Sequence, residues 1–423
     1  MLSVAASNAS KVSSLKPSLR ILITAFVLAL YRLGSWLPAP GVNPSTVRDL
    51  FNQSGTGTIL GYLNLFSGQA LQNLSLFALG IMPYITASII VQLLTVVVPS
   101  LEKMQKEGEA GQRRITQYTR YLTVLLAAGQ SAGYVVVFHN GSALGGSDAL
   151  PDLNARVFIL IVLSLTAGST LLMFMGEYIT RRGVGNGQSL LIFCSILTSV
   201  PTAISAWLNG SVFEKLSLPI VVLGVILAVV FINEGQRRIP IQYARRGATA
   251  VGQTTYMPLR VNMAGVIPVI FAAAVLLLPP TIGQLLNIPW LANTFAPTTW
   301  PSIILEFTLI VVFTFFYTAV IFNPVDQADN LKKYGGFIPG IRPGRPTAQF
   351  LDHVMVRLTL PGAFYLGIIA VLPTIFIRYA GFSQATARAL GGTSVLIIVG
   401  VALDTMRQVQ SQVMMRHYEG FLK

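Results

Sequence analysis

The chain has 423 residues, of which 53% are hydrophobic and only 10% are charged. Soluble proteins carry about 25% charged residues, so this composition, with a mean hydropathy of +0.65, excludes an ordinary soluble enzyme, a disordered chain and the usual kind of nucleic-acid-binding domain. The net charge of +14 would suggest a nucleic-acid partner in a soluble protein. In a membrane protein, basic loops first of all fix the orientation, and we expect a polytopic membrane protein.

Ten apolar runs approach or reach the length of about 20 residues that a helix needs to cross a bilayer. The sixth and seventh runs are the shortest, and the even number places both termini on one side. In chain order the runs are Leu19–Leu37, Leu74–Val98, Tyr118–Phe138, Arg156–Met175, Gln188–Leu208, Leu218–Asn233, Met263–Leu278, Ser302–Phe322, Val354–Ile377 and Gly391–Val409.

Lysine and arginine are divided unevenly between the two sides of these runs. Of the 29, the segments on the side of the termini carry 23, and the opposite side carries four, at Arg48, Lys215, Arg378 and Arg388. Because cytoplasmic loops hold the excess of basic residues, both termini are predicted to be cytoplasmic.

The segment between the first two runs has an unusual composition. A polar, glycine-rich stretch is followed by ILGYLNLFSGQALQN, which is too short and too polar to span. A re-entrant or short amphipathic element is plausible here. Irregular backbone at membrane depth is tolerated only where protein or a water-filled cavity surrounds it, so this segment hints at a cavity.

Two loops on the basic side, Glu234–Asn262 and Asn323–Arg357, are large and strongly charged. They can be topology signals alone, but the earlier loops already set the orientation. The glycine and proline residues of GGFIPGIRPGRPT suit a shaped, exposed loop. We expect both loops to dock an acidic or nucleic-acid partner.

Ionisable groups are missing from the middle of the spans, where an ion-coupled transporter needs them. Glu177, Glu306, Asp404 and Arg32 all lie toward span ends. The three histidines show no metal-ligand spacing, so no metal or cofactor is expected. GVGNG lacks the spacing and the preceding strand of a dinucleotide fingerprint and is interpreted as a tight turn. A channel, a secondary transporter and an intramembrane enzyme remain open on this basis, and the first is favoured.

Uncharged polar residues on the apolar helices are the remaining candidates for function. Such groups either join helices by hydrogen bonds or mark a functional surface. They are Ser88, Gln92, Gln130 and Asn262.

Long strings of the sequence, in order and nearly end to end, resemble the SecY family of protein-conducting channels. They include YRLGSWLPAPGV, FALGIMPYITASIIVQLLTVVVP, KEGEAGQRRITQYTRYLT, GVGNGQSLLIF, QRRIPIQYARR, LRVNMAGVIPVIFA, FIPGIRPGRPT and GGTSVLIIVGVALD. The resemblance implies an all-α membrane protein. Its ten transmembrane helices would form two inverted-topology halves, residues 1–209 and 210–423, around an hourglass pore with a plug helix and a lateral gate.

The resemblance also implies roles for individual residues. The plug corresponds to Leu60–Gln72, including Leu63, Leu65, Phe66 and Gly68. The pore ring corresponds to Ile81, Ile85, Ile192, Ile270 and Ile397. Ser88, Gln92, Gln130 and Asn262 fall at the lateral gate, and Arg245, Arg246 and Arg342 fall in the docking loops.

The function that the resemblance implies is passive, gated translocation of unfolded polypeptides and insertion of membrane proteins, without enzymatic activity. The expected partners are SecE and SecG subunits, the SecA motor, the ribosome with its ribosomal RNA, preprotein or nascent chains with signal sequences, and lipid. The expected location is the bacterial cytoplasmic (inner) membrane. A secondary transporter with inverted repeats stays as the alternative.

Overall fold

The computed structural model describes residues 17–53, 59–139, 154–243, 255–285, 288–296, 299–380 and 391–421. Seven helices in this part of the chain are long and apolar enough to cross a membrane. They are α7 (Glu109–His139), α8 (Ala155–Arg182), α9 (Gly187–Leu208), α10 (Val212–Glu234), α14 (Trp300–Ile321), α16 (Arg345–Ala380) and α18 (Gly392–Phe421).

The other three predicted spans correspond to shorter or broken helices. The first is α2 (Pro17–Gly34). The second is α5 (Met82–Val97), which bends by 98° into α6 (Pro99–Lys106). The seventh is α11 (Ile267–Leu276), followed by α12 (Leu278–Leu285). Together with the seven long helices they give a ten-span, all-α membrane fold.

The predicted start of the second span, at Leu74, is wrong. The segment before Met82 forms a 3₁₀ turn, η1 (Leu71–Asn73), and further turns. Leu74 and Gly80 have positive φ angles of 42° and 58°, which a continuous helix cannot accommodate. Pro83 occupies the first helical turn, where its missing N–H costs nothing. The seventh span also begins later than predicted, so Asn262 lies in a turn before α11.

The outer surface is apolar, as a protein in contact with lipid requires. Phe231 and Ile220 of α10 and Leu22 of α2 are 79%, 72% and 65% exposed. Such residues would be costly in water but face hydrocarbon favourably. The chain is therefore a multi-pass membrane protein.

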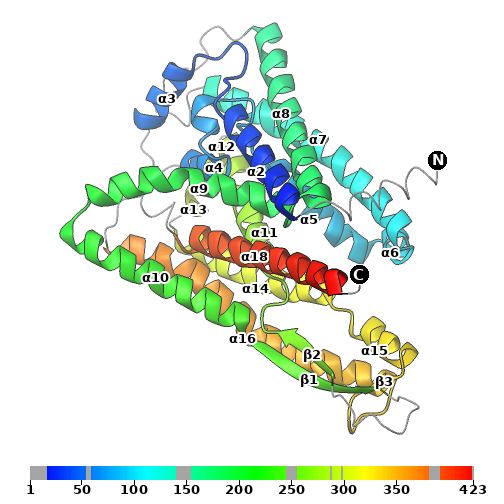
Figure 1. Ribbon diagram of the computed structural model, residues 1–423. Helices are drawn as coiled ribbons and strands as arrows, with labels where there is room; N and C mark the ends of the chain where they lie inside the picture. The colour runs from blue at the N-terminus through cyan, green and yellow to red at the C-terminus, as the bar shows by residue number, and fades with distance from the viewer. Residues whose placement is uncertain are drawn as a thin grey trace.

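Most of the N-terminal helices lie apart from most of the C-terminal helices, although α12 lies among the upper, N-terminal group and contacts α7 (Figure 1). Helices α2 to α8 gather in the upper part of the view, with α3 (Pro44–Gln53) and α4 (Ile59–Phe66), and α10, α14, α16 and α18 gather below. Helices α9 and α10 meet at the left edge, where the predicted boundary between residues 209 and 210 falls. The short helix α13 (Pro289–Thr294) follows α12.

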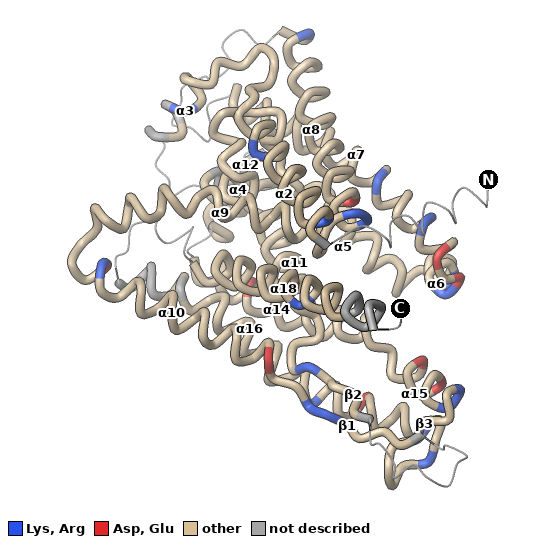
Figure 2. The backbone as a smooth tube through the Cα atoms, viewed as in Figure 1, with Lys and Arg blue, Asp and Glu red and all other residues tan. Residues whose placement is uncertain are grey.

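A three-stranded sheet joins the two basic loops, and the sequence analysis did not anticipate it. Strand β1 (Gln236–Tyr243) pairs antiparallel with β2 (Thr255–Arg260) on one side and with β3 (Gly336–Phe337) on the other. Alternate residues Ile239 and Ile241 are buried. Ile239 packs with Leu259, Ile338 and Leu351 in a small core. Charged residues concentrate on this sheet, α15 (Pro324–Lys333) and α6, and are sparse along the long helices (Figure 2).

Candidate functional site

Four isoleucines from three different helices line one cavity of about 330 Å³. One of them, Ile267, is the first residue of α11, and the other three belong to the predicted pore ring. Ile85 comes from α5, Ile192 from α9 and Ile270 from α11, and they are only 4%, 2% and 4% exposed. The helices therefore bring aliphatic side chains from both parts of the chain to one surface.

The other two isoleucines of the predicted ring lie nearby in the same apolar core but outside the cavity lining. Ile81 is the residue directly before α5, and Ile397 is on α18. Both are buried members of the core that contains Ile85, Ile192 and Ile270. The structure thus brings three of the five predicted residues to one cavity and places the other two in the core around it.

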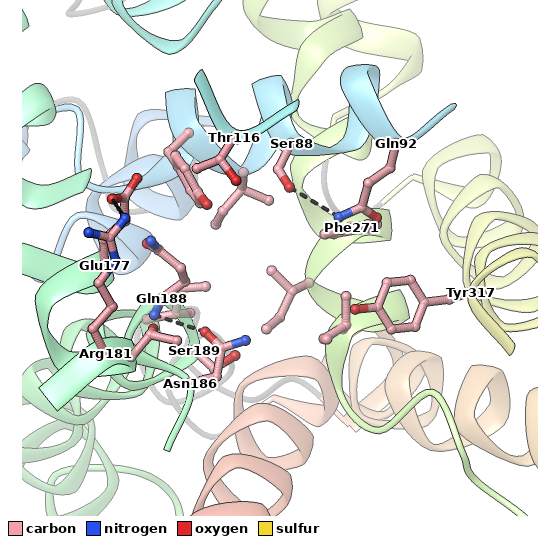
Figure 3. A pocket seen from close by; sticks show the side chains of 16 residues that line it. Ser88, Gln92, Thr116, Glu177, Arg181, Asn186, Gln188, Ser189, Phe271 and Tyr317 are labelled. Atoms are coloured by element: carbon pink, nitrogen blue, oxygen red, sulfur yellow. Dashed lines mark hydrogen bonds and ion pairs between the residues drawn. The ribbon is translucent and has the colours of Figure 1, made fainter. Parts of the chain in front are cut away.

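The rest of the cavity lining is largely polar (Figure 3). Gln188 points into it, and its Oε1 atom is buried without a hydrogen-bond partner. Glu177 and Arg181 stand at one side of the view, while Ser88 and Gln92 stand at the other. The cavity can therefore hold water over much of its surface and meets an aliphatic wall at the isoleucines.

The four predicted gate residues do not form one network. Ser88 and Gln92 lie one turn apart on α5, and Gln92 donates to Ser88 Oγ at 3.2 Å, while Gln92 Oε1 has no partner. Gln130 is half-buried on α7 and lines neither this cavity nor the next one. Helices α5 and α11 do contact each other, and Ser88 and Gln92 line the same cavity as Ile270 and Phe271 of α11.

Asn262, the fourth gate residue, lies in a second cavity of about 410 Å³ at the base of the β1–β2 hairpin. Its Nδ2 donates to Asn233 Oδ1 at 3.1 Å and to the carbonyl of Gly265 at 3.0 Å. Arg407 of α18 reaches the same place, donating to the Asn233 carbonyl at 2.8 Å and to Glu234 Oε1 at 2.7 Å. The sequence analysis counted Arg407 only as a basic residue of the C-terminal segment.

An ion pair at the edge of the first cavity was also missed. Arg120 of α7 donates through Nε to Glu177 Oε1 of α8 at 2.8 Å and contacts Oε2 as well. Arg181 approaches the same carboxylate at 3.4 Å. The two side chains of the main pair are 23% and 11% exposed, so the pair fastens α7 to α8. The sequence did contain a signal for this pair, because Arg120 and Glu177 carry opposite charges near the ends of consecutive spans.

The turn before α9 fixes how that helix enters the cavity. Gly185 has a φ of 83°, and Asn186 caps α9 by accepting from the Gln188 N–H at 3.1 Å. The Val184 and Gly187 N–H groups donate to Thr24 and Thr180 hydroxyls at 3.0 and 2.9 Å. GVGNG therefore acts as the predicted tight turn and places Gln188 and Ile192 in the wall.

The predicted plug segment forms helix α4 and a compact turn after it. Leu63, Leu65 and Phe66 are 9%, 6% and 7% exposed and belong to the same core as the isoleucines. Gly68 has a φ of 67°, a conformation that favours glycine. The end of α4 lies against α9 and against Gly80, next to Ile81.

The docking residues fall partly outside the described part of the chain. Arg342 is exposed in the turn between β3 and α16, where its carbonyl accepts from the Thr347 hydroxyl at 2.9 Å. Arg245 and Arg246 lie outside the described residues.

Comparison with known proteins adds the family. The family model described as SecY matches residues 75–406. The protein translocase subunit SecY of Mycobacterium tuberculosis is 48% identical over 96% of this chain and 96% of its own length.

Solved structures agree in fold. One described as "The plug domain of the SecY protein stablizes the closed state of the translocation channel and maintains a membrane seal" has a TM-score of 0.66 at 18% identity, covering 93% of this chain and 92% of its own. Sec61 in a canine ribosome-channel complex gives 0.61 at 18% identity with the same coverage. The full-length match at 48% identity settles the assignment: the chain belongs to the SecY family of protein translocase subunits, which are channels and not enzymes.

Proposed function

We propose that unfolded polypeptides cross the membrane through this chain between Ile85, Ile192 and Ile270, with Ile81 and Ile397 completing the constriction. The observation that carries the proposal is the convergence of three predicted ring isoleucines, from α5, α9 and α11, on one polar-walled cavity that Ile267 also lines. The two predicted halves, residues 1–209 and 210–423, would enclose this path.

An aliphatic constriction suits a conduit that must pass chains of any sequence. Its side chains offer no fixed polar partner, so they hold no particular residue of the passing chain. A narrow hydrophobic passage also dewets and so blocks ions at rest. The polar lining beside it keeps the approach hydrated without binding the substrate tightly.

The plug would be the segment Leu60–Gln72, which contains most of α4. It supports this role that Leu63, Leu65 and Phe66 are buried in the same large apolar core that contains the ring isoleucines, so the segment would close the path a second time. Ser88 and Gln92 stand beside the contact of α5 with α11, where the helices would separate to release hydrophobic signal sequences into lipid, with Gln130 and Asn262 flanking the opening. The alternative, a secondary transporter, has no such observation in its favour.

Partner proteins would supply the driving force for translocation. The basic residues of the β1–β2–β3 sheet and its loops, including Arg245, Arg246 and Arg342, would bind the ribosome through its RNA or the SecA motor. The similar Sec61 was solved in a ribosome-channel complex. SecE and SecG would complete the translocase. The 23 to 4 division of basic residues supports cytoplasmic termini and, in a bacterium, the inner membrane.

The experiment is site-specific crosslinking to a stalled preprotein. A photoreactive amino acid replaces Ile192 in one variant and Ile196 in another. Both side chains are buried on α9, at 2% and 0% exposure, but only Ile192 lines the cavity. Crosslinks to the translocating chain at 192 and not at 196 are expected. Equal crosslinking at both positions, or none at 192, would contradict the assigned path.

A further inference from the structure

A buried tyrosine touches the end of the plug segment from a neighbouring helix. The Tyr31 side chain of α2 is 1% exposed. Its hydroxyl lies 3.1 Å from the Ser67 carbonyl, directly after α4, and 2.6 Å from Ser195 Oγ of α9. One phenol therefore joins three elements that are far apart in the sequence.

The hydrogen-bond inventory determines the direction of the contact with Ser67. A carbonyl only accepts, so the Tyr31 hydroxyl is the donor to the Ser67 carbonyl. Ser195 Oγ donates to the Leu191 carbonyl at 2.8 Å, and either hydroxyl can be the donor in the contact between Tyr31 and Ser195. The ring of Phe77 stacks on Tyr31 at 6.0 Å between centroids, which holds the phenol in place.

The next residues along the chain strengthen the same attachment. Arg32 donates through Nη1 to the Gly68 carbonyl at 3.2 Å. A Cβ atom added at Gly68 would stand 2.6 Å from the Tyr31 hydroxyl oxygen and 3.2 Å from the Ser195 Cα. Position 68 thus needs glycine both for its φ of 67° and for the close approach of Tyr31.

We propose that Tyr31, seated on Ser195, is a positioning residue that latches the plug in its closed place, with Arg32 as a second donor. The proposal rests on the proposed function, because it takes residues 60–72 as the plug. When the plug leaves, the Ser67 and Gly68 carbonyls exchange these donors for water. The bonds therefore exist only in the closed state, and a contact made in one state alone shifts the population toward that state.

Tyr31→Phe is the sharpest test because it removes only the hydroxyl and keeps the ring stacked on Phe77. It leaves the buried Ser67 carbonyl without its donor. The loss of one net hydrogen bond should raise the population of displaced plug, and hence the resting ion leak, by about two- to tenfold. The measurement is ion flux through the purified translocase in proteoliposomes without substrate. Ser195→Ala, which removes the hydroxyl that contacts the Tyr31 phenol, should also raise the resting ion leak.

Tyr134→Phe is the matched control, since Tyr134 is a buried tyrosine of α7, 8% exposed, away from α4. It should remain as tight as the parent. The decisive comparison is deletion of residues 59–66, alone and with Tyr31→Phe. If Tyr31 acts through the plug, the double variant leaks no more than the deletion.

Three outcomes would overturn the latch. If Tyr31→Phe and Ser195→Ala are both as ion-tight as the parent while the plug deletion leaks, the proposed pore and plug stand and the latch fails. If Tyr31→Phe adds its full leak to that of the deletion, it acts on general packing. A plug deletion that is itself tight would refute the plug assignment in the proposed function, and the latch with it.

Discussion

Arg407 of α18 binds Glu234 at the end of α10 with 2.7 Å between Nη2 and Oε1, although the two residues are 173 positions apart. The same nitrogen donates to the Asn233 carbonyl at 2.8 Å. Because β1 begins at Gln236, this contact fastens the base of the hairpin to the last helix of the chain.

Arg407→Gln should loosen that base. We expect hydrogen exchange of the first amides of β1 to quicken by about twofold, a small factor because Glu234 is open to water and such pairs contribute little. Lys106→Gln, which removes the comparable exposed pair with Glu102 on α6, should leave β1 exchange unchanged. Unchanged exchange in Arg407→Gln would mean that the hairpin is held by its strands alone.

The proposed seal predicts a leak from Ile85→Ser combined with Ile192→Ser. Each change adds polarity and width to the constriction, so dewetting fails, and ion flux through the purified channel should rise most when residues 59–66 are also deleted. Ile196→Ser is the control on the same helix. It should cost about 2–5 kcal/mol of stability and leave the channel tight. Ion-tight ring variants without the plug would contradict the assignment.

The orientation predicts where cysteine probes react from outside intact cells. In a Cys194→Ala background, Asn293→Cys should label readily, whereas Gln105→Cys and Tyr334→Cys should label only after the membrane is permeabilised. All three positions are exposed. Labelling of Tyr334→Cys in intact cells would reverse the topology that the basic residues indicate.

The docking proposal predicts that charge reversal on the basic loops weakens partner binding. Arg342→Glu should reduce SecA-driven export, and Arg245→Glu with Arg246→Glu should reduce ribosome binding, because attraction to acidic protein or phosphate becomes repulsion. Binding by the parent should also fall as salt rises. Arg48→Glu, on the opposite side, is the control. Normal export and binding by the reversed variants would leave these loops as topology signals only.

The spans could be predicted from the sequence because lipid imposes a length and an apolar composition on every crossing helix. The residues at which helices begin could not be predicted. The turn before Met82 depends on positive φ angles at Leu74 and Gly80, and packing imposes these angles. The hairpin had a readable signal, the alternation of Ile239 and Ile241 among polar residues, but the charges around it favoured a loop.

Some residues of the candidate site could be predicted from the sequence, and others could not. Motif strings pointed to Ile85, Ile192 and Ile270, which do line one cavity. The role of Tyr31 was not readable, because a tyrosine in an apolar run shows nothing of a hydroxyl partner 164 positions away. The resemblance placed Asn262 with Ser88 and Gln92 at the lateral gate, yet its neighbours are Asn233 and Gly265.

Strand β1 pairs with β2 from its own loop and with β3 from the other, so residues 236–243, 255–260 and 336–337 share one set of backbone hydrogen bonds. A force that a partner applies to either loop is therefore passed through the same sheet to the helices that adjoin its strands in the chain. These helices are α10, α11, α15 and α16. Lesions nearly a hundred codons apart should give the same genetic defect, and a compensating change in one loop should suppress damage in the other.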